Sequence, residues 1–303
     1  MSWTLFHGSL QLGLIYGLLA MGVYTSFRIL NVPDLTADGS FTLGLAVSAA
    51  LCVRTHPIAG IVLAVLAGAL AGALTGFFQT KAGIHPILSG ILTMSGLYTV
   101  NLFLMGESSN LSLIGKDTLF AIAYKVLPGL AKNDVKLLIA LGICLLVLGI
   151  MRWFFKTHLG LCIRATGNNM DMVRSSSINV DGMKILALSI ANGCVGLSGA
   201  VLAQYQGYAD IGSGVGIVVI GLASVIIGEV FFGRRSVGLG FFSAVIGAIL
   251  YRIVIAVALK SEIFPAYALK LVSAGIVAAA LSLPALRQAL GRQLRKRKAV
   301  RDA

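Results

Sequence analysis

Charged side chains are scarce in this sequence. Only 12% of its 303 residues are charged and 57% are hydrophobic, and the mean hydropathy is +0.92. A soluble globular domain carries about 25% charged residues. The composition therefore excludes an ordinary soluble domain and indicates an integral membrane protein.

Motifs for nucleotide, metal or disulfide chemistry are also missing. No GxxxxGK[ST] phosphate-binding loop occurs, so the chain is not expected to hydrolyse ATP itself. The four cysteines lie far apart in or beside apolar runs, without a CxxC or Cys/His spacing, as is typical of packing residues. The four histidines lie near the ends of apolar runs, which disfavours an intramembrane enzyme. We therefore expect a non-enzymatic protein without a metal or cofactor.

Long apolar runs fill most of the chain. A membrane-spanning helix needs about 20 apolar residues, and the sequence predicts an all-α bundle of about 8–10 such helices within a single membrane domain, residues 1–284. The predicted spans are Leu10–Tyr24, Phe41–Val53, Pro57–Phe78, Ile87–Leu104, Leu137–Phe155, Met183–Gln204, Gly212–Gly228, Leu239–Leu259 and Pro265–Pro284. Residues 285–303 follow as a basic tail with seven Lys or Arg residues: Arg287, Arg292, Arg295, Lys296, Arg297, Lys298 and Arg301.

Lys and Arg residues set the expected orientation, because they gather in cytoplasmic loops. The tail and the basic segment 152–184 are placed inside, so the C-terminus is predicted to be cytoplasmic. The net charge of +13 is interpreted as orientation and contact with anionic lipid, not as nucleic-acid binding. Alternation of the spans then places 105–133 outside and Lys81 inside. The N-terminus is then also placed outside, unless the short segment Phe41–Val53 does not span the membrane.

Small residues recur along one face of the third apolar run. In AGALAGALTG (67–76), Gly68, Gly72 and Gly76 are spaced by four and share one helix face. Such faces let helix backbones approach closely in lipid. The pattern predicts tight packing, either inside the bundle or at a dimer seam.

A polar segment separates the first two spans. The stretch NVPDLTADGSFTLG (31–44) contains Asp34, Asp38 and Ser40 beside helix-breaking Pro and Gly. Irregular backbone at membrane depth is tolerated only where it is buried in protein or lines a wet cavity, and transporters use such breaks to expose helix ends to a substrate. We interpret the segment as a discontinuity on the cytoplasmic side of a pathway, with Asp38 or Ser40 capping a helix that begins near Phe41. Alternatively, both aspartates are only helix caps in a loop, and the two interpretations are compatible.

Polar side chains inside the spans are further candidates for a pathway. Arg252 and Lys270 are predicted at similar depth on the same side, where two cations would attract a carboxylate. The alternative is that both side chains snorkel to the headgroups. Asn192 and Gln204 would either contact a substrate or form interhelical hydrogen bonds.

The longest basic loop, LCIRATGNNMDMVRSSSINVDGMKI (161–185), has an amphipathic middle. Its apolar edge comprises Met170, Val173 and Ile178, and its polar edge Asn168, Asn169, Asp171 and Arg174. The run Thr166-Gly-Asn-Asn predicts a helix start, because Asn caps helix N-termini well. A short helix lying across the cytoplasmic face either docks a partner or is a solvated loop.

The same region resembles a known family. R-A-x-G-x-N at Arg164–Asn169, S-I-N-V at Ser177–Val180 and the following small-residue span that ends in Ala-Gln-Tyr are similar to permease subunits of bacterial ABC importers of the branched-chain amino acid and ribose type. The likeness covers nearly the whole chain, and the stretch at 31–44 is similar to the amino-acid branch of that superfamily.

The resemblance implies partners and a mechanism. Two permeases, expected to be identical copies, pair in the cytoplasmic (inner) membrane of a bacterium. ATP-binding cassette subunits bind below and hydrolyse ATP, and an extracytoplasmic substrate-binding protein docks above. A coupling helix at Arg164–Val180 is implied to contact the ATPase. The implied contacts are Arg164, Gly167, Asn168, Asn169, Asp171 and Arg174.

The substrate that the resemblance implies is an amino acid or a similar small carboxylate. A nucleoside or sugar is the alternative within the same superfamily. An ion-coupled secondary transporter is the alternative from another class. It is disfavoured because the spans show no inward-facing acidic pair and no evident internal repeat.

Overall fold

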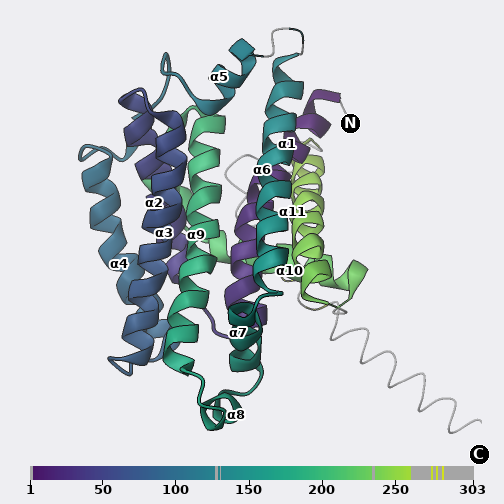
Figure 1. The fold of residues 1–303 in the computed structure, drawn as a ribbon. Coiled ribbons are helices and arrows are strands. Elements are labelled where there is room, and N and C mark those ends of the chain that lie inside the picture. The colour runs from purple at the N-terminus through teal and green to yellow at the C-terminus, as the bar shows by residue number, and fades with distance from the viewer. Residues whose placement is uncertain are drawn as a thin grey trace, which may run out of the picture.

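A computed structural model describes residues 3–126, 129, 131–233 and 236–260, together with 274, 275, 278 and 282. In this part of the chain, eight helices are long and apolar enough to cross a membrane. The fold is an all-α membrane bundle, as predicted (Figure 1). Apart from the last positions above, the predicted span Pro265–Pro284 lies outside the described residues, as do Lys270 and the tail 285–303.

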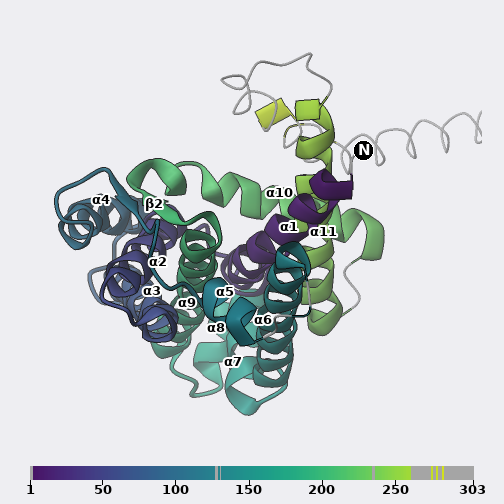
Figure 2. The same cartoon turned by 90° about the horizontal axis from the view of Figure 1, so that it is seen from above.

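The elements follow in this order: α1 (Trp3–Val23), the π-helix η1 (Tyr24–Ile29), α2 (Thr36–Val53), α3 (Pro57–Thr80), α4 (Pro86–Leu104), β1 (Asn110–Ser112), α5 (Leu119–Val126), α6 (Lys132–Phe154), α7 (His158–Asn168), α8 (Met170–Ser175), α9 (Val180–Gln206), β2 (Tyr208–Asp210), the 3-10 turn η2 (Ile211–Gly214), α10 (Ile217–Phe232) and α11 (Val237–Lys260). Figure 2 shows α10 crossing one edge of the bundle from the side of β2 toward α11.

Contacts between helix ends show which loops lie at each of the two ends of the bundle. The antiparallel pair β1–β2 brings the chain after α4 beside the chain after α9, at what we call the ribbon end. The side-chain amide of Gln11 donates to the carbonyl of Asn133 at 2.6 Å, so the N-terminal part of α1 lies near the start of α6. Lys81 pairs with Asp181 at 3.3 Å at the opposite end, which also carries α7 and α8 and is called the α7–α8 end (Figure 1). These positions agree with the predicted alternation in which α2 spans.

The small-residue face of α3 packs inside the chain. A Cβ added to Gly68 would collide with the carbonyl of Asn192, and one added to Gly72 would collide with the carbonyl of Leu188. Both contacts lie on α9, the helix that α3 follows along most of its length. Of the two predicted uses of this face, tight packing inside the bundle is the one observed.

The first two helices differ from the predicted spans. Helix α1 continues without a break into η1, so this span reaches Ile29 rather than Tyr24. Helix α2 begins at Thr36, and the prediction of a start near Phe41 was wrong. The polar first turn of α2 is buried because its hydroxyls find partners on other helices: the Oγ1 atoms of Thr36 and Thr75 lie 2.7 Å apart.

The contact between α3 and α9 yields a stability prediction. Gly72→Leu inserts a side chain where the two backbones touch, so we expect it to destabilise the protein by about 1–3 kcal/mol or more. Gly96→Leu on α4 is the matched control, because nothing lies within 4 Å of a Cβ added there. The amount of protein in the membrane and its Tm in detergent measure both changes. Equal Tm values for the two variants would contradict this packing.

Candidate functional site

The break between η1 and α2 is held together by Asp34. The chain turns at Asn31, whose φ is +57°, and one carboxylate oxygen of Asp34 accepts the backbone N–H of Thr36 at 2.9 Å. The other oxygen accepts from the side-chain amide of Asn192 at 2.6 Å. Asn192 lies near the middle of α9 and is fully buried, and Asp34 is 7% exposed. Asp34 therefore satisfies the first N–H of α2, from the residue before its N-cap Leu35, and ties the break to the centre of the bundle.

Asp38 caps a helix other than its own. Its carboxylate accepts the backbone N–H groups of Gly216 and Val218, both at 2.9 Å, at the start of α10. This start lies inside the bundle, because Gly214 packs directly against the backbone carbonyl of Asp38. The prediction that Asp38 or Ser40 caps its own helix was therefore wrong. Ser40 is fully buried within α2, and its hydroxyl has no hydrogen-bond partner among the described residues.

Gln204 joins helices at the ribbon end. Its amide nitrogen donates to the hydroxyl of Ser48 at 3.0 Å and to the carbonyl of Pro57 at 2.9 Å. Its amide oxygen accepts the backbone N–H of Leu119 at 2.7 Å. These contacts match the second sequence interpretation, that of interhelical hydrogen bonding.

Arg252 lies between α11 and α1. Its guanidinium carbon is 3.6 Å from the centre of the Tyr16 ring, and its side chain lines a cavity of about 350 Å³ with Leu5, Ser9 and Leu12. This cavity shares no lining residue with the one beside Asp38. The structure therefore does not bring these two candidate pathway residues together.

The predicted coupling segment consists of two helices. Helix α7 ends at Asn168, and the side-chain oxygen of Asn169 accepts the backbone N–H groups of Asp171 and Met172, both at 3.1 Å, to cap α8. The expected Asn cap is present, but one continuous helix over Arg164–Val180 was wrong. The extended backbone of Asn169, with φ −154° and ψ 104°, separates the two helices.

The amphipathic pattern of this segment is observed. Val173 is buried at 3% exposure, as predicted for the apolar edge. The exposed members of the predicted coupling set are Arg164, Asn168, Asn169, Asp171 and Arg174. Gly167 instead faces the protein, because a Cβ there would collide with the carbonyl of Ile29. The polar edge therefore forms an open surface, whereas Gly167 joins α7 to the end of η1.

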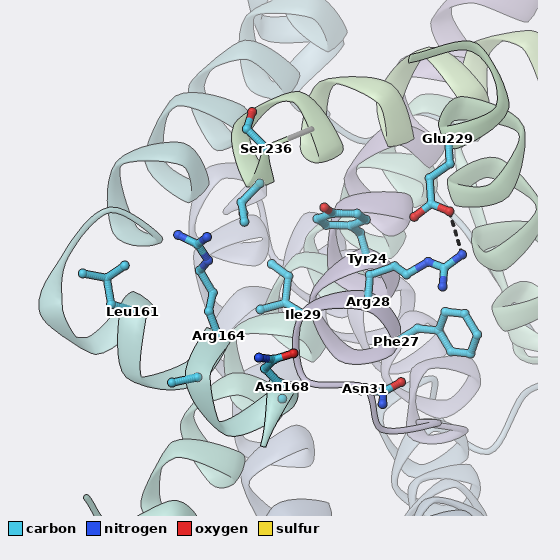
Figure 3. A pocket seen from close by; sticks show the side chains of 13 residues that line it. Tyr24, Phe27, Arg28, Ile29, Asn31, Leu161, Arg164, Asn168, Glu229 and Ser236 are labelled. Atoms are coloured by element: carbon cyan, nitrogen blue, oxygen red, sulfur yellow. Dashed lines mark hydrogen bonds and ion pairs between the residues drawn. The ribbon is translucent and has the colours of Figure 1, made fainter. Parts of the chain in front are cut away.

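A cavity of about 710 Å³ lies between α7, η1 and the end of α10 (Figure 3). Arg28 on η1 donates to a carboxylate oxygen of Glu229 on α10 at 2.6 Å, while Arg164 and Asn168 line the cavity from α7. The sequence interpretation missed Arg28 and Glu229. The available signal was two isolated opposite charges in otherwise apolar spans, where an ionisable residue is expected to have a partner.

These features together define a class of protein. A polytopic helical bundle with two chain breaks inside it is typical of membrane transport proteins. The chain belongs to the family described as branched-chain amino acid transport system / permease component, whose model matches residues 5–282. It is therefore a permease of ABC type, as the sequence resemblance predicted.

Relatives within this class have different named substrates. The chain is 36% identical over 270 residues to the tyrosine transport system permease protein of Clostridioides difficile, covering 89% of this chain and 88% of that protein. It is 26% identical over 238 residues to the D-allose transport system permease protein of Escherichia coli, covering 77% and 69%. The solved PsaBC from Streptococcus pneumoniae in complex with Fab shares the fold, with a TM-score of 0.55 at 14% identity over 91% of this chain and 90% of that one.

The ion pair between η1 and α10 yields a second prediction. Arg28→Met or Glu229→Gln removes this partly buried ion pair, so we expect each to lower the free energy of unfolding by about 1–3 kcal/mol. The double variant should lose less than the sum of the two losses. Asp117→Asn is the control, because its pair with Lys125 is exposed and we expect a change below about 1 kcal/mol. Additive losses, measured by unfolding in detergent, would contradict a direct contact.

Proposed function

We propose that this ABC permease is the membrane-spanning subunit of an ATP-driven importer for an amino acid, with an aromatic amino acid such as tyrosine as the first candidate. Two copies pair, ATP-binding cassette subunits bind the α7–α8 end, and a substrate-binding protein delivers cargo at the ribbon end. The α7–α8 end and the C-terminus are cytoplasmic. The observation that carries the proposal is the 36% identity over 89% of the chain to a permease named for tyrosine transport.

The exposed polar edge of α7 and α8 supports the proposal that the ATPase binds at these two helices. Asn168, Asn169, Asp171 and Arg174 are exposed, and Val173 behind them is buried and anchors α8 to the bundle. A partner that displaces α7 also displaces η1, because Gly167 touches the carbonyl of Ile29. Displacement of η1 then acts on α10 through the pair of Arg28 and Glu229.

The proposed pathway follows the buried breaks of the chain. Asp34 and Asn192 hold the first break, and Asp38 holds the start of α10. At a separate cavity near the ribbon end, Arg252 is proposed to attract the carboxylate of the cargo, since a guanidinium matches the geometry of a carboxylate. Irregular backbone at these depths is the kind of structure that transporters use to reach a substrate.

Uptake by the reconstituted complex tests the cargo. The full chain would be placed in proteoliposomes with its proposed ATPase and binding-protein partners, and labelled L-tyrosine and D-allose would be offered in turn. We expect ATP-dependent accumulation of tyrosine and none of allose. Accumulation of allose without tyrosine would overturn the amino-acid assignment and favour the sugar alternative, which the relative from Escherichia coli represents.

Alanine substitution of the exposed edge tests the coupling surface. We expect the triple variant Asn168→Ala, Asn169→Ala, Arg174→Ala to reach the membrane but to lose ATPase co-purification and transport by at least about tenfold, the effect of 1.4 kcal/mol of lost binding. Lys132→Ala is the control, because this exposed residue begins α6 at the other end of the bundle. Wild-type co-purification and transport by the triple variant would remove this surface from the coupling role.

A further inference from the structure

A second cavity lies beside the start of α10 and opens at the surface of the bundle, where Ser95, Tyr98 and Val215 are exposed. It has a volume of about 360 Å³ and lies between α2, α4 and the chain around η2. Asp38, Asn101 and Tyr98 line it together with the apolar side chains of Met94 and Ile211. Its size is within the range of about 300–1,000 Å³ that small-molecule sites occupy. A mostly apolar wall with a few polar groups is also typical of such sites.

Asp38 changes what the start of α10 offers to a ligand. A free helix N-terminus presents N–H donors and partial positive charge, and it attracts anions. Here the Asp38 carboxylate already accepts the N–H groups of Gly216 and Val218. The backbone N–H of Ile217 also bonds to this carboxylate, so about one of its four lone-pair directions is left for a ligand. The cavity wall therefore presents the Asp38 carboxylate to a ligand in place of the N–H donors of α10.

Asn101 is an independent second acceptor at this cavity. It is 1% exposed, and its side-chain nitrogen donates to the carbonyl of Gly39 at 3.3 Å. This bond fixes which end of the amide is the nitrogen. The other end, the oxygen Oδ1, has no hydrogen-bond partner among the described residues. A buried polar atom without a partner costs about 1–3 kcal/mol. The oxygen is itself buried, so a ligand in the cavity would have to shift neighbouring atoms to donate to it and remove that cost.

The remaining lining residues fit a cation better than an anion. No Lys, Arg or His is among the described residues that line the cavity. Tyr98 adds an aromatic ring, and the faces of such rings attract cations. An ammonium group has three donors and no acceptor, which matches a carboxylate and a free amide oxygen.

From this arrangement we infer that the cavity between α2, α4 and η2 binds the ammonium group of the transported amino acid, with Asp38 and Asn101 as its acceptors. The inference rests on the proposed function, since it names a subsite for that cargo. Asp38 supplies the charge and Asn101 supplies a directional hydrogen bond. The apolar wall of Met94 and Ile211 contacts the side chain of the cargo.

Cysteine labelling tests the cavity separately from transport. Ser95 lines the cavity and Thr99 does not, although both are exposed on α4. The variants Ser95→Cys and Thr99→Cys would each be made in the full chain. Each would be reacted with two thiol reagents, a cationic ethylammonium thiosulfonate and an anionic sulfonatoethyl thiosulfonate. The native cysteines Cys52, Cys144, Cys162 and Cys194 are buried, and the wild-type chain gives their background. We expect the ratio of cationic to anionic rates to be about tenfold higher at Ser95→Cys, because the Asp38 charge is close. Equal ratios at the two positions would overturn the inference.

Protection from labelling tests the ligand chemistry. L-tyrosine, tyramine, which lacks the carboxylate, and 4-hydroxyphenylpropionate, which lacks the ammonium group, would each be added before the reagent. We expect tyrosine and tyramine to slow labelling of Ser95→Cys and 4-hydroxyphenylpropionate to have no effect. Adding Asn101→Leu should raise the concentration needed for half protection by about tenfold, as expected for a lost hydrogen bond to a charged group.

The outcomes separate this inference from the proposed function. If tyramine protects Ser95→Cys but the complex does not import tyrosine, the ammonium site is retained. Only the assignment of tyrosine as the cargo is then overturned. Import of tyrosine without protection by tyrosine or tyramine would overturn the site and leave the function intact. Equal protection by 4-hydroxyphenylpropionate and tyramine would also overturn it. The labelling ratio of Ser95→Cys is measured without a change at Asp38 or Asn101, so it does not depend on whether variants at those positions fold.

Discussion

The need to hydrogen-bond every backbone group inside the membrane shapes this protein more than any other constraint. Lipid offers no donors or acceptors, so a chain break at membrane depth has to be satisfied by the protein itself. Asp34 does this at the start of α2, and Asp38 does it at the start of α10. Each unsatisfied N–H would cost about 1–3 kcal/mol. The two aspartates therefore permit both helices to begin inside the bundle.

A continuous set of contacts joins the exposed polar edge of α7 and α8 to the cavity beside Asp38. Helix α7 touches η1 through Gly167, and η1 is ion-paired to the end of α10 through Arg28 and Glu229. The opposite end of α10 is held by Asp38, which lines the cavity. The π-helical form of η1 places an irregular turn at the junction, and such turns often occur at functional sites. Force applied at α7 would thus reach the cavity through rigid helices and a few polar contacts.

Much of the site was visible in the sequence, but the partners of its residues were not. The polar break at 31–44, the Asn cap of α8 and the buried Val173 follow from local patterns of polarity and capping. The cap that Asp38 provides could not be predicted from local patterns, because its helix begins far along the chain at Ile217. Asn101 gave the same signal as Asn192, a polar side chain in an apolar run, but it was not among the sequence candidates. Its importance depends on the carbonyl of Gly39 and on the cavity beside it.

The sequence by itself determined the membrane environment, the approximate spans and the family, because these depend on hydropathy and on motifs that are local in the chain. It also determined that the small-residue face of α3 would pack closely. Only the tertiary structure decided that this face meets α9, that α2 begins at Thr36, and that Asp34 and Asp38 serve different helices. The physical reason is that a buried polar group is stable only with a partner. That partner is brought close by packing of distant segments, which periodicity along the chain does not specify.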